Sequence, residues 1–213
     1  MRTAQIPGAC LIAAALLFWV SWLLMPGVGV TDAATIFELV TAQRSSVLLS
    51  VIAQLLSAAL YVPALLGITS AIQLGANRAV RWGAGVLLLG AMGSAADAIF
   101  HLLAYAMTAP GVEHGSQLPV MTFMQGPGLL LVAPLILSFF VGGAWLSVAF
   151  ARLAIVPWTN VWTHAAAVGI ALLGTMGATA GILSARTVGL AVLGAISVAQ
   201  GWAGAALYRG RAR

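Results

Sequence analysis

The sequence has no lysine and a single cysteine, Cys10, among its 213 residues. Without lysine, the chain cannot form a Schiff base with a carbonyl substrate or use an amine nucleophile. One cysteine excludes a disulfide within the chain and a metal centre built from several thiolates. Composition alone therefore removes several classes of enzyme and of small secreted protein.

Charge is also scarce, because 6% of the residues are charged and 62% are hydrophobic, with a mean hydropathy of +1.07. Soluble domains carry roughly a quarter charged residues, so this composition is typical of a membrane protein. The nine basic residues are arginines, and they lie at the ends of apolar runs rather than on one soluble surface. This distribution argues against a nucleic-acid partner and is typical of residues that set membrane topology.

Six apolar runs are each long enough to cross a hydrocarbon core of ~30 Å as a helix. The predicted fold is therefore all-α, a six-helix membrane bundle that forms a single transmembrane domain over residues 1–213. The positive-inside rule favours both termini in the cytoplasm, because only Arg44 and Arg186 then lie outside. The predicted spans are residues 9–25, 46–73, 82–107, 129–153, 162–183 and 188–208.

Both long connections lie on the predicted outer side. In TDAATIFELVTAQR, residues 31–44, Thr31 and Asp32 are typical of a helix start, so a short helix at the membrane interface is predicted. In GVEHGSQLPVMTFMQGPG, residues 111–128, glycine and proline punctuate the apolar residues, and this segment is expected to dip into the lipid headgroups. The alternative is that both segments are amphipathic linkers resting on the lipid surface.

An ionisable pair, Asp97 and His101, interrupts the third span. It belongs to a stripe on one helix face, with spacings of four, three, four and four: Gly90, Ser94, Asp97, His101 and Tyr105. The small residues allow another helix to approach closely, and the polar ones lie in the outer half of the membrane. A carboxylate at the bilayer centre costs at least about 2.5 kcal/mol, which favours a functional role. The alternative is that the pair only holds helices together through hydrogen bonds.

The second span has a matching polar face, formed by Gln54, Ser57 and Tyr61 at spacings of three and four. Consecutive spans joined by a short turn are antiparallel neighbours, and all three residues are predicted at the depth of the stripe. The two faces are expected to line one pocket on the outer side. Asp97 and His101 are the candidate catalytic residues, and the candidate substrate-binding residues are Gln54, Ser57, Tyr61, Ser94 and Tyr105.

Other chemistries fit these residues less well. Asp97 and His101 supply two ligands, whereas zinc and iron sites use three or more, so no metal and no other cofactor is expected. A catalytic triad is disfavoured because Ser94 lies on the far side of Asp97 from His101 and no strained nucleophile turn marks a serine. His164 follows two tryptophans near the inner end of its span and is predicted to be an interfacial anchor.

The segments QRSSVLLSVIAQLLSAALYVPALLGITSAIQ and ANRAVRWGAGVLLLGAMGSAA resemble small six-span membrane proteins of high-GC bacteria that have no assigned activity. The resemblance covers most of the chain and is mainly compositional. It implies the same fold and a multi-pass location in the bacterial cytoplasmic (inner) membrane. The chain is also similar to membrane terpene cyclases in size and in having an intramembrane carboxylate, although those have seven spans and two acids.

Three functions remain open for such a pocket. The leading hypothesis is an enzyme in which Asp97 and His101 form an acid/base pair acting on a lipid-like or isoprenoid-like substrate. The second is a proton-coupled transporter or a lipid-binding transport protein, which needs a further polar path on the inner side, and Ser197, Gln200 and His164 can supply it. The third is a non-catalytic subunit whose glycine-rich faces pack on a second copy or a larger membrane partner. The expected partners are membrane lipid and a lipophilic small molecule.

Overall fold

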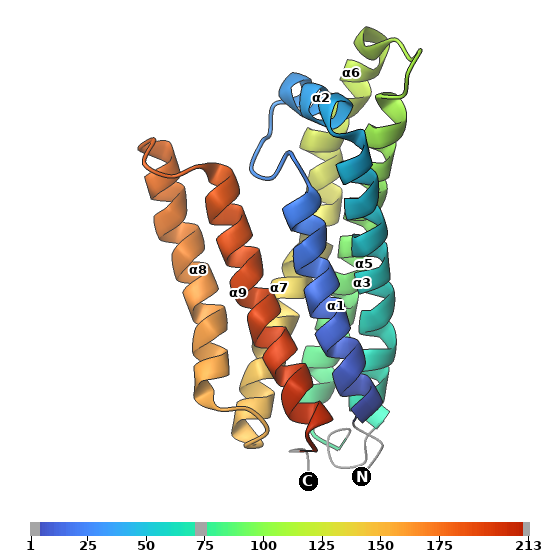
Figure 1. Ribbon diagram of the computed structural model, residues 1–213. Helices are drawn as coiled ribbons and strands as arrows, with labels where there is room; N and C mark the ends of the chain where they lie inside the picture. Colours follow the sequence, from blue (N-terminus) through green and yellow to red (C-terminus); the bar gives the residue numbers. More distant parts are fainter. Residues whose placement is uncertain (1–4, 71–75, 211–213) are drawn as a thin grey trace.

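The computed structural model describes residues 5–70 and 76–210, which form helices joined by short connections (Figure 1). Six helical stretches in these residues are long and apolar enough to cross a membrane, which confirms the predicted number of spans. Residues 71–73 of the predicted second span, and Arg2, Arg211 and Arg213, lie outside the described residues. The helices are α1 (Gln5–Leu24), α2 (Ala33–Ala42), α3 (Arg44–Ser70), α5 (Arg78–Met107), α6 (His114–Phe123), η2 (Met124–Gly128), α7 (Leu129–Arg152), α8 (Trp158–Thr179) and α9 (Ala185–Tyr208).

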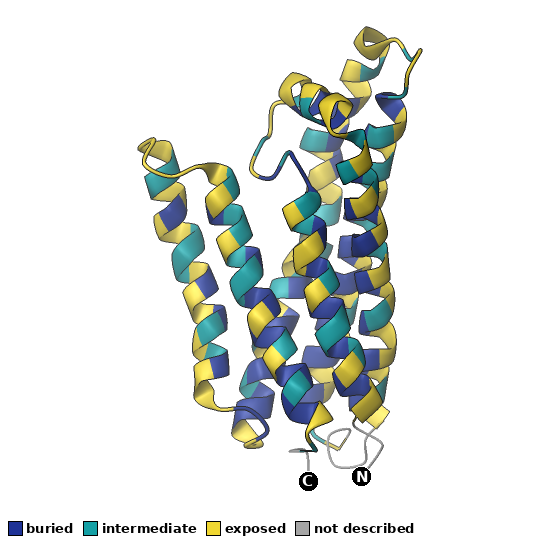
Figure 2. Cartoon of the chain, viewed as in Figure 1, coloured by how far each residue is buried: buried dark blue, intermediate teal, exposed yellow. Residues whose placement is uncertain are grey.

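The long helices run alternately up and down and pack in a ring (Figure 1). α3 packs between α1 and α5, α5 packs on α7, and α9 packs on both α1 and α8, while α7 touches α8 and α9 and so closes the ring. The start of α1 and the end of α9 lie at one end of the bundle, termed the terminal end, and α2 and α6 lie at the other, termed the α2 end (Figure 1). Large apolar side chains are exposed on the outside of the ring, as expected for helices that face lipid (Figure 2).

Two glycines bring the backbones of α5 and α7 nearly into contact. A Cβ atom on Gly90 would lie 2.2 Å from Phe139 Cα, and a Cβ atom on Gly142 would lie 2.2 Å from the Leu87 backbone nitrogen. Atoms in a packed protein interior do not approach this closely, so a side chain at either position would push the helices apart. The small residues of the third span thus allow close helix packing.

Three serine hydroxyls of α3 fasten this helix to α1. Each donates to a backbone carbonyl oxygen of α1, so a buried hydroxyl is satisfied inside the membrane-spanning region. The donor and acceptor pairs are Ser46 with Leu24 at 2.6 Å, Ser50 with Ser21 at 2.7 Å, and Ser57 with Ala14 at 2.8 Å. This face of α3 is therefore committed to helix packing.

The helix predicted after Thr31 is present as α2. Asp32 is its N-cap and accepts hydrogen bonds from the hydroxyl and the backbone N–H of Thr35, at 2.6 and 2.8 Å. These two bonds also lower the pKa of the Asp32 carboxyl. Ile36 and Val40 are buried on the inward face of α2, so the helix covers the α2 end of the bundle.

The second outer segment differs from its prediction, because glycine and proline do not break it. α6 continues through η2 into α7, so the fourth apolar stretch runs over His114–Arg152 instead of beginning at residue 129. η2 is a π-helical turn, with hydrogen bonds between residues five apart, and Pro127 lies inside it. Such a widened turn accommodates a proline, which has no N–H to donate and crowds the preceding turn.

The two arginines at the α2 end bind backbone carbonyl groups in the last turn of a neighbouring helix or just after it. Arg186 donates to the carbonyl oxygens of Leu23 and Pro26 at 3.1 and 2.9 Å, and Arg44 donates to that of Tyr105 at 2.7 Å. The final carbonyls of a helix have no partner within the helix and carry partial negative charge, so a cation there is stabilising. These two arginines therefore have a structural reason to depart from the positive-inside pattern.

Replacing Arg186 with methionine should lower the free energy of unfolding by about 1–2 kcal/mol, because two charge-assisted hydrogen bonds at a partly exposed site are lost. Thermal unfolding of the purified protein in detergent would show a lower melting temperature. Arg209 is exposed at the terminal end, so Arg209→Met is the matched control and should melt like the wild type. Equal melting temperatures for Arg186→Met and the wild type would contradict the role given to Arg186.

Candidate functional site

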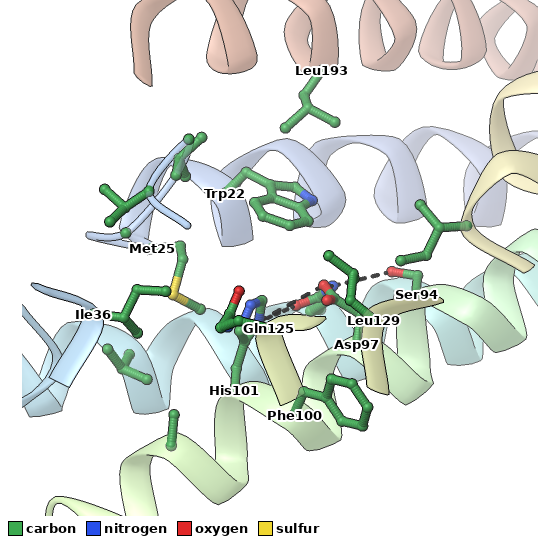
Figure 3. A pocket seen from close by; sticks show the side chains of 18 of the residues that line it. Trp22, Met25, Ile36, Ser94, Asp97, Phe100, His101, Gln125, Leu129 and Leu193 are labelled. Carbon is green, nitrogen blue, oxygen red and sulfur yellow. Dashed lines mark hydrogen bonds and ion pairs between the residues drawn. The ribbon is translucent and has the colours of Figure 1, made fainter. Parts of the chain in front are cut away.

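The half of the bundle nearer α2 encloses a cavity of about 240 Å³ (Figure 3). This volume is somewhat below the usual range of small-molecule pockets, roughly 300–1,000 Å³. The wall is built from α1, α2, α3, α5, α7 and α9, together with η2 and the connection at residues 27–30. Most of the wall is apolar, and its larger side chains include Phe18, Trp22, Phe100, Met124, Phe139 and Leu193.

One side of the cavity is polar. Gln54 Nε2 donates to Asp97 Oδ2 at 2.9 Å and lies 3.4 Å from Ser94 Oγ, while Gln54 Oε1 lies 3.3 Å from His101 Nδ1. Asp97 Oδ2 and His101 Nδ1 are 3.9 Å apart, which is too long for a hydrogen bond. The Gln54 amide therefore joins the carboxyl group of Asp97 to the imidazole of His101. Figure 3 labels Asp97 and His101 on this side of the cavity. Gln54 and Asp97 are both buried, with 1% and 8% of their surface exposed.

Several polar atoms of the cavity residues have no hydrogen-bond partner within the described part of the chain. They include Asp97 Oδ1, His101 Nε2, the amide atoms of Gln125 and the buried Trp22 Nε1. The Trp22 ring stands edge-on to the His101 ring, with centroids 5.7 Å apart and an interplanar angle of 88°. Buried polar groups normally find partners, so Trp22 Nε1, which is the fully buried atom of this set, favours a ligand that can hydrogen-bond.

The structure brings Gln54, Ser94, Asp97 and His101 together at the cavity wall. The other predicted substrate-binding residues point elsewhere. Ser57 is bonded to α1, the Tyr105 ring lies 4.1 Å below the Arg44 guanidinium, and the Tyr61 hydroxyl donates to Gln200 Oε1. None of these three lines the cavity.

Tyr61 lies deeper than predicted because of where α3 begins. The helix starts at Arg44 near the α2 end, so Gln54 is about 15 Å along its axis and Tyr61 about 25 Å, at 1.5 Å per residue. Gln54 can therefore reach Asp97, whereas Tyr61 lies in the terminal half of the bundle. Its ring stands edge-on to that of Phe139, with centroids 5.3 Å apart.

Two lining residues with polar side-chain atoms, Trp22 and Gln125, were missed by sequence reasoning. Trp22 lies in a strongly apolar first span, and nothing in its spacing distinguishes it from a lipid-facing tryptophan. Gln125 lies in η2, and the sequence Gly126–Pro127–Gly128 after it was the available signal. π-helical turns occur frequently at functional sites, because they change which side chains face inward.

Comparison with protein-family models, with curated proteins and with solved structures finds no match to this chain. Over residues 5–70 and 76–210, no three His, Cys, Asp or Glu side chains lie close enough together to hold a metal ion. The geometry of the cavity is therefore the basis on which a function can be argued.

Proposed function

We propose that this protein is a membrane enzyme that moves a proton on a lipid-like or isoprenoid-like substrate held in the cavity. The observation that supports the proposal is the Gln54 amide, which joins Asp97 to His101 on one wall of an otherwise apolar cavity. A carboxyl group and an imidazole are common general acids and bases, and a third group that orients them is a recurrent arrangement. The apolar walls suit a hydrocarbon chain, and the polar wall suits one polar end.

In this proposal each polar side chain has its own task. Asp97 gives or takes the proton through Oδ1, because Oδ2 is held by Gln54. His101 has Nδ1 directed at Gln54 Oε1, so Nε2 is the nitrogen available to the substrate. Trp22 Nε1 donates to an oxygen at the polar end of the substrate. Ser94 limits the movement of the Gln54 amide, from which its hydroxyl oxygen is 3.4 Å away.

We also propose the bacterial cytoplasmic membrane as the location, with the terminal end inside the cell. The charge distribution supports this orientation, since the arginines at the α2 end are both bonded to helix carbonyls. The described arginines at the terminal end are Arg78, Arg81, Arg152 and Arg209. The cavity then lies toward the outer leaflet, and the substrate enters from that side.

Asp97→Asn should lower the rate of substrate conversion at least 100-fold, because removal of a general acid or base typically costs about 10²–10⁴-fold in rate. The purified protein would be placed in liposomes made from a bacterial membrane lipid extract, in D₂O buffer. Mass spectrometry would follow which lipid species is consumed or gains deuterium at carbon. Circular dichroism would check that the variant is folded, as expected because asparagine has the size of aspartate.

Glu38→Gln is the matched control, since it removes another carboxylate, exposed on α2 and outside the cavity, and should leave the rate unchanged. Equal rates for the wild type and Asp97→Asn would overturn the proposal. So would a wild type that changes no lipid species. Uptake of a solute driven by a pH gradient, and lost in Asp97→Asn, would replace the enzyme with a proton-coupled transporter.

A further inference from the structure

The terminal half of the bundle holds a second group of polar side chains. It draws on α3, α7, α8 and α9, and its members are all buried, with at most 8% of the surface of any one exposed. The group, termed the inner cluster, consists of Tyr61, Ser147, Asn160, His164, Ser197 and Gln200. None of these side chains lines the cavity beside Asp97.

Part of the inner cluster is bonded internally. Besides the Tyr61–Gln200 hydrogen bond, Asn160 Nδ2 donates to the Ala199 carbonyl oxygen at 2.7 Å, and His164 Nδ1 lies 3.4 Å from Ser147 Oγ. Each of these contacts joins two different helices. The cluster is therefore a shared feature of the helix interfaces and not a set of isolated polar residues.

Four atoms of the inner cluster are buried with no hydrogen-bond partner in the part of the chain that the structure describes. They are Asn160 Oδ1, His164 Nε2, Ser197 Oγ and Gln200 Nε2. Burying such atoms without a partner is costly, and in an apolar helix bundle leucine could replace each of these residues without that cost. The arrangement therefore points to a bound species that supplies the missing hydrogen bonds.

Two of these atoms converge on one point of α7. A Cβ atom on Gly143 would lie 2.8 Å from Gln200 Nε2 and 3.3 Å from His164 Nε2, so both nitrogens face the side of Gly143 that has no side chain. Gly143 is one turn from Phe139 and one turn from Ser147 on the inward face of α7. The missing side chain thus leaves the polar groups of α8 and α9 facing the α7 backbone.

The chemistry of the inner cluster favours water as its occupant. The unpartnered atoms include a donor at Gln200 Nε2, an acceptor at Asn160 Oδ1 and a hydroxyl at Ser197. The cluster contains no carboxylate and no arginine, so a bound ion would lack a charged partner. Buried water typically makes about three hydrogen bonds to polar groups that are otherwise unsatisfied. His164 adds a further unpartnered nitrogen, Nε2, to which such water can hydrogen-bond.

One aromatic ring lies between the inner cluster and the cavity. Phe139 lines the cavity, and its ring packs edge-on against Tyr61, which belongs to the inner cluster. The Phe139 ring also stacks on Phe18, with centroids 4.6 Å apart, and only 2% of its surface is exposed. Its backbone is fixed against Gly90, so the ring is held firmly in place.

We propose that the inner cluster is a water-filled site reached from the terminal end of the bundle, and that Phe139 separates it from the cavity. The inference does not rest on the proposed enzyme activity. The protein then has two polar sites, one on each side of a single aromatic barrier. Water and protons reach the inner cluster from the predicted cytoplasmic side, and lipophilic molecules reach the cavity from the other side.

The test uses cysteine accessibility, since the one native cysteine can be removed as Cys10→Ala. Ser197→Cys would be added to this background, because serine and cysteine have similar size and the Ser197 hydroxyl has no bond to lose. A small charged methanethiosulfonate reagent, which needs a water-exposed thiolate, would be applied to sealed membrane vesicles of either orientation. Ser197→Cys should react at least 10-fold faster when the reagent is on the side of the terminal end.

Two control variants define the limits of the measurement. Val168→Cys lies one turn from His164 on α8 with 60% of the Val168 surface exposed toward lipid, so it should react slowly from both sides. Ser94→Cys lies on the cavity wall and should react from the α2 side. Failure of Ser197→Cys to react from either side, in a protein that elutes as a folded species, would show a dry inner cluster and overturn the proposal.

The barrier has a test of its own. Phe139→Ala in the Ser197→Cys background should increase labelling from the α2 side at least 10-fold, because the two polar sites then become continuous. Phe140→Ala is the matched control on the next residue of α7. Phe140 borders the cavity, but its ring packs on Phe139 and not on Tyr61, so this variant should leave the sidedness of labelling unchanged. If Ser197→Cys is labelled at equal rates from both sides while Phe139 is intact, Phe139 is not a barrier. This measurement can be made even if Phe139→Ala does not fold.

Discussion

Gly90→Ala is expected to destabilise the protein by at least about 3 kcal/mol, although it adds a single methyl group. Its Cβ would lie 2.2 Å from Phe139 Cα and from the Phe139 backbone nitrogen, and backbone atoms cannot rotate out of the way as a side chain can. Overpacking a core typically costs 1–3 kcal/mol when side chains can adjust, so a clash with a helix backbone belongs at or above the upper limit. Titration with a denaturing detergent, followed by circular dichroism, would measure the decrease in the free energy of unfolding.

Gly85→Ala provides the matched control in the same helix. A Cβ atom on Gly85 would meet no atom within 4 Å, so this change should be neutral or should stabilise α5 by up to about 1 kcal/mol through helix propensity. A difference of several kcal/mol between two Gly→Ala variants five residues apart would isolate the packing effect from the intrinsic effect of glycine. Equal stabilities would show that α5 and α7 are not packed as closely as the structure has them.

The number of helices follows from the sequence because hydrophobic length decides it. A run of about 20 apolar residues has few alternatives to a spanning helix, since backbone groups in lipid must bond within the segment. The boundaries were less predictable. Glycine and proline at residues 126–128 predicted an interruption, but η2 absorbs Pro127 without ending the helix. Helix propensity marks a proline as a residue that tends to break a helix. It does not tell whether packing against neighbouring helices keeps the helix continuous through that proline.

Part of the candidate site could also be predicted from the sequence. Helical periodicity put Ser94, Asp97 and His101 on one face of α5, and the short turn to α3 brought Gln54 opposite to them. The same reasoning misassigned Ser57, because both α1 and α5 pack on α3 and residue type alone does not tell which of the two a serine faces. Trp22 comes from α1, which is not adjacent to α5 in sequence, so its place depends on how the ring closes, and Gln125 faces the cavity from the π-helical turn η2.

His164 was predicted to lie at the membrane interface, but the structure buries it. Two nearby tryptophans, exposed in the structure, made an interfacial position plausible, yet the imidazole is buried with 5% of its surface exposed. The prediction that Ser197, Gln200 and His164 supply a polar group on the inner side was made for the transport hypothesis, and the structure places them in one buried region beside Tyr61. The membrane-spanning core thus contains polar groups at two depths, and Phe139 lines the cavity of one set while its ring packs on Tyr61 of the other.

Gln54→Leu is expected to cost about 3 kcal/mol in stability, because Asp97 then keeps its buried position but loses the amide that donates to it. Leaving a buried polar group without its partner costs more than the hydrogen bond itself contributes, and the cost is larger for a charged group. Asp97→Leu in the same chain should restore most of the loss, since removing both partners leaves no unsatisfied carboxyl. A double-mutant cycle, measured by detergent-induced unfolding, would give this coupling directly.

The sign of that coupling separates two explanations of the polar wall. If Gln54 exists to hold Asp97 for a substrate, the double variant Gln54→Leu with Asp97→Leu should be nearly as stable as the wild type and bind or convert no substrate. If the pair exists to hold α3 to α5, the double variant should be no more stable than Gln54→Leu, because both variants lack the same cross-helix hydrogen bonds. Ser57→Ala is the control partner for Asp97→Leu: Ser57 lies on the same helix as Gln54 but is bonded to Ala14, so its effect should simply add to that of Asp97→Leu. Additivity for Gln54 and Asp97 as well would mean that the amide does not position the carboxyl group.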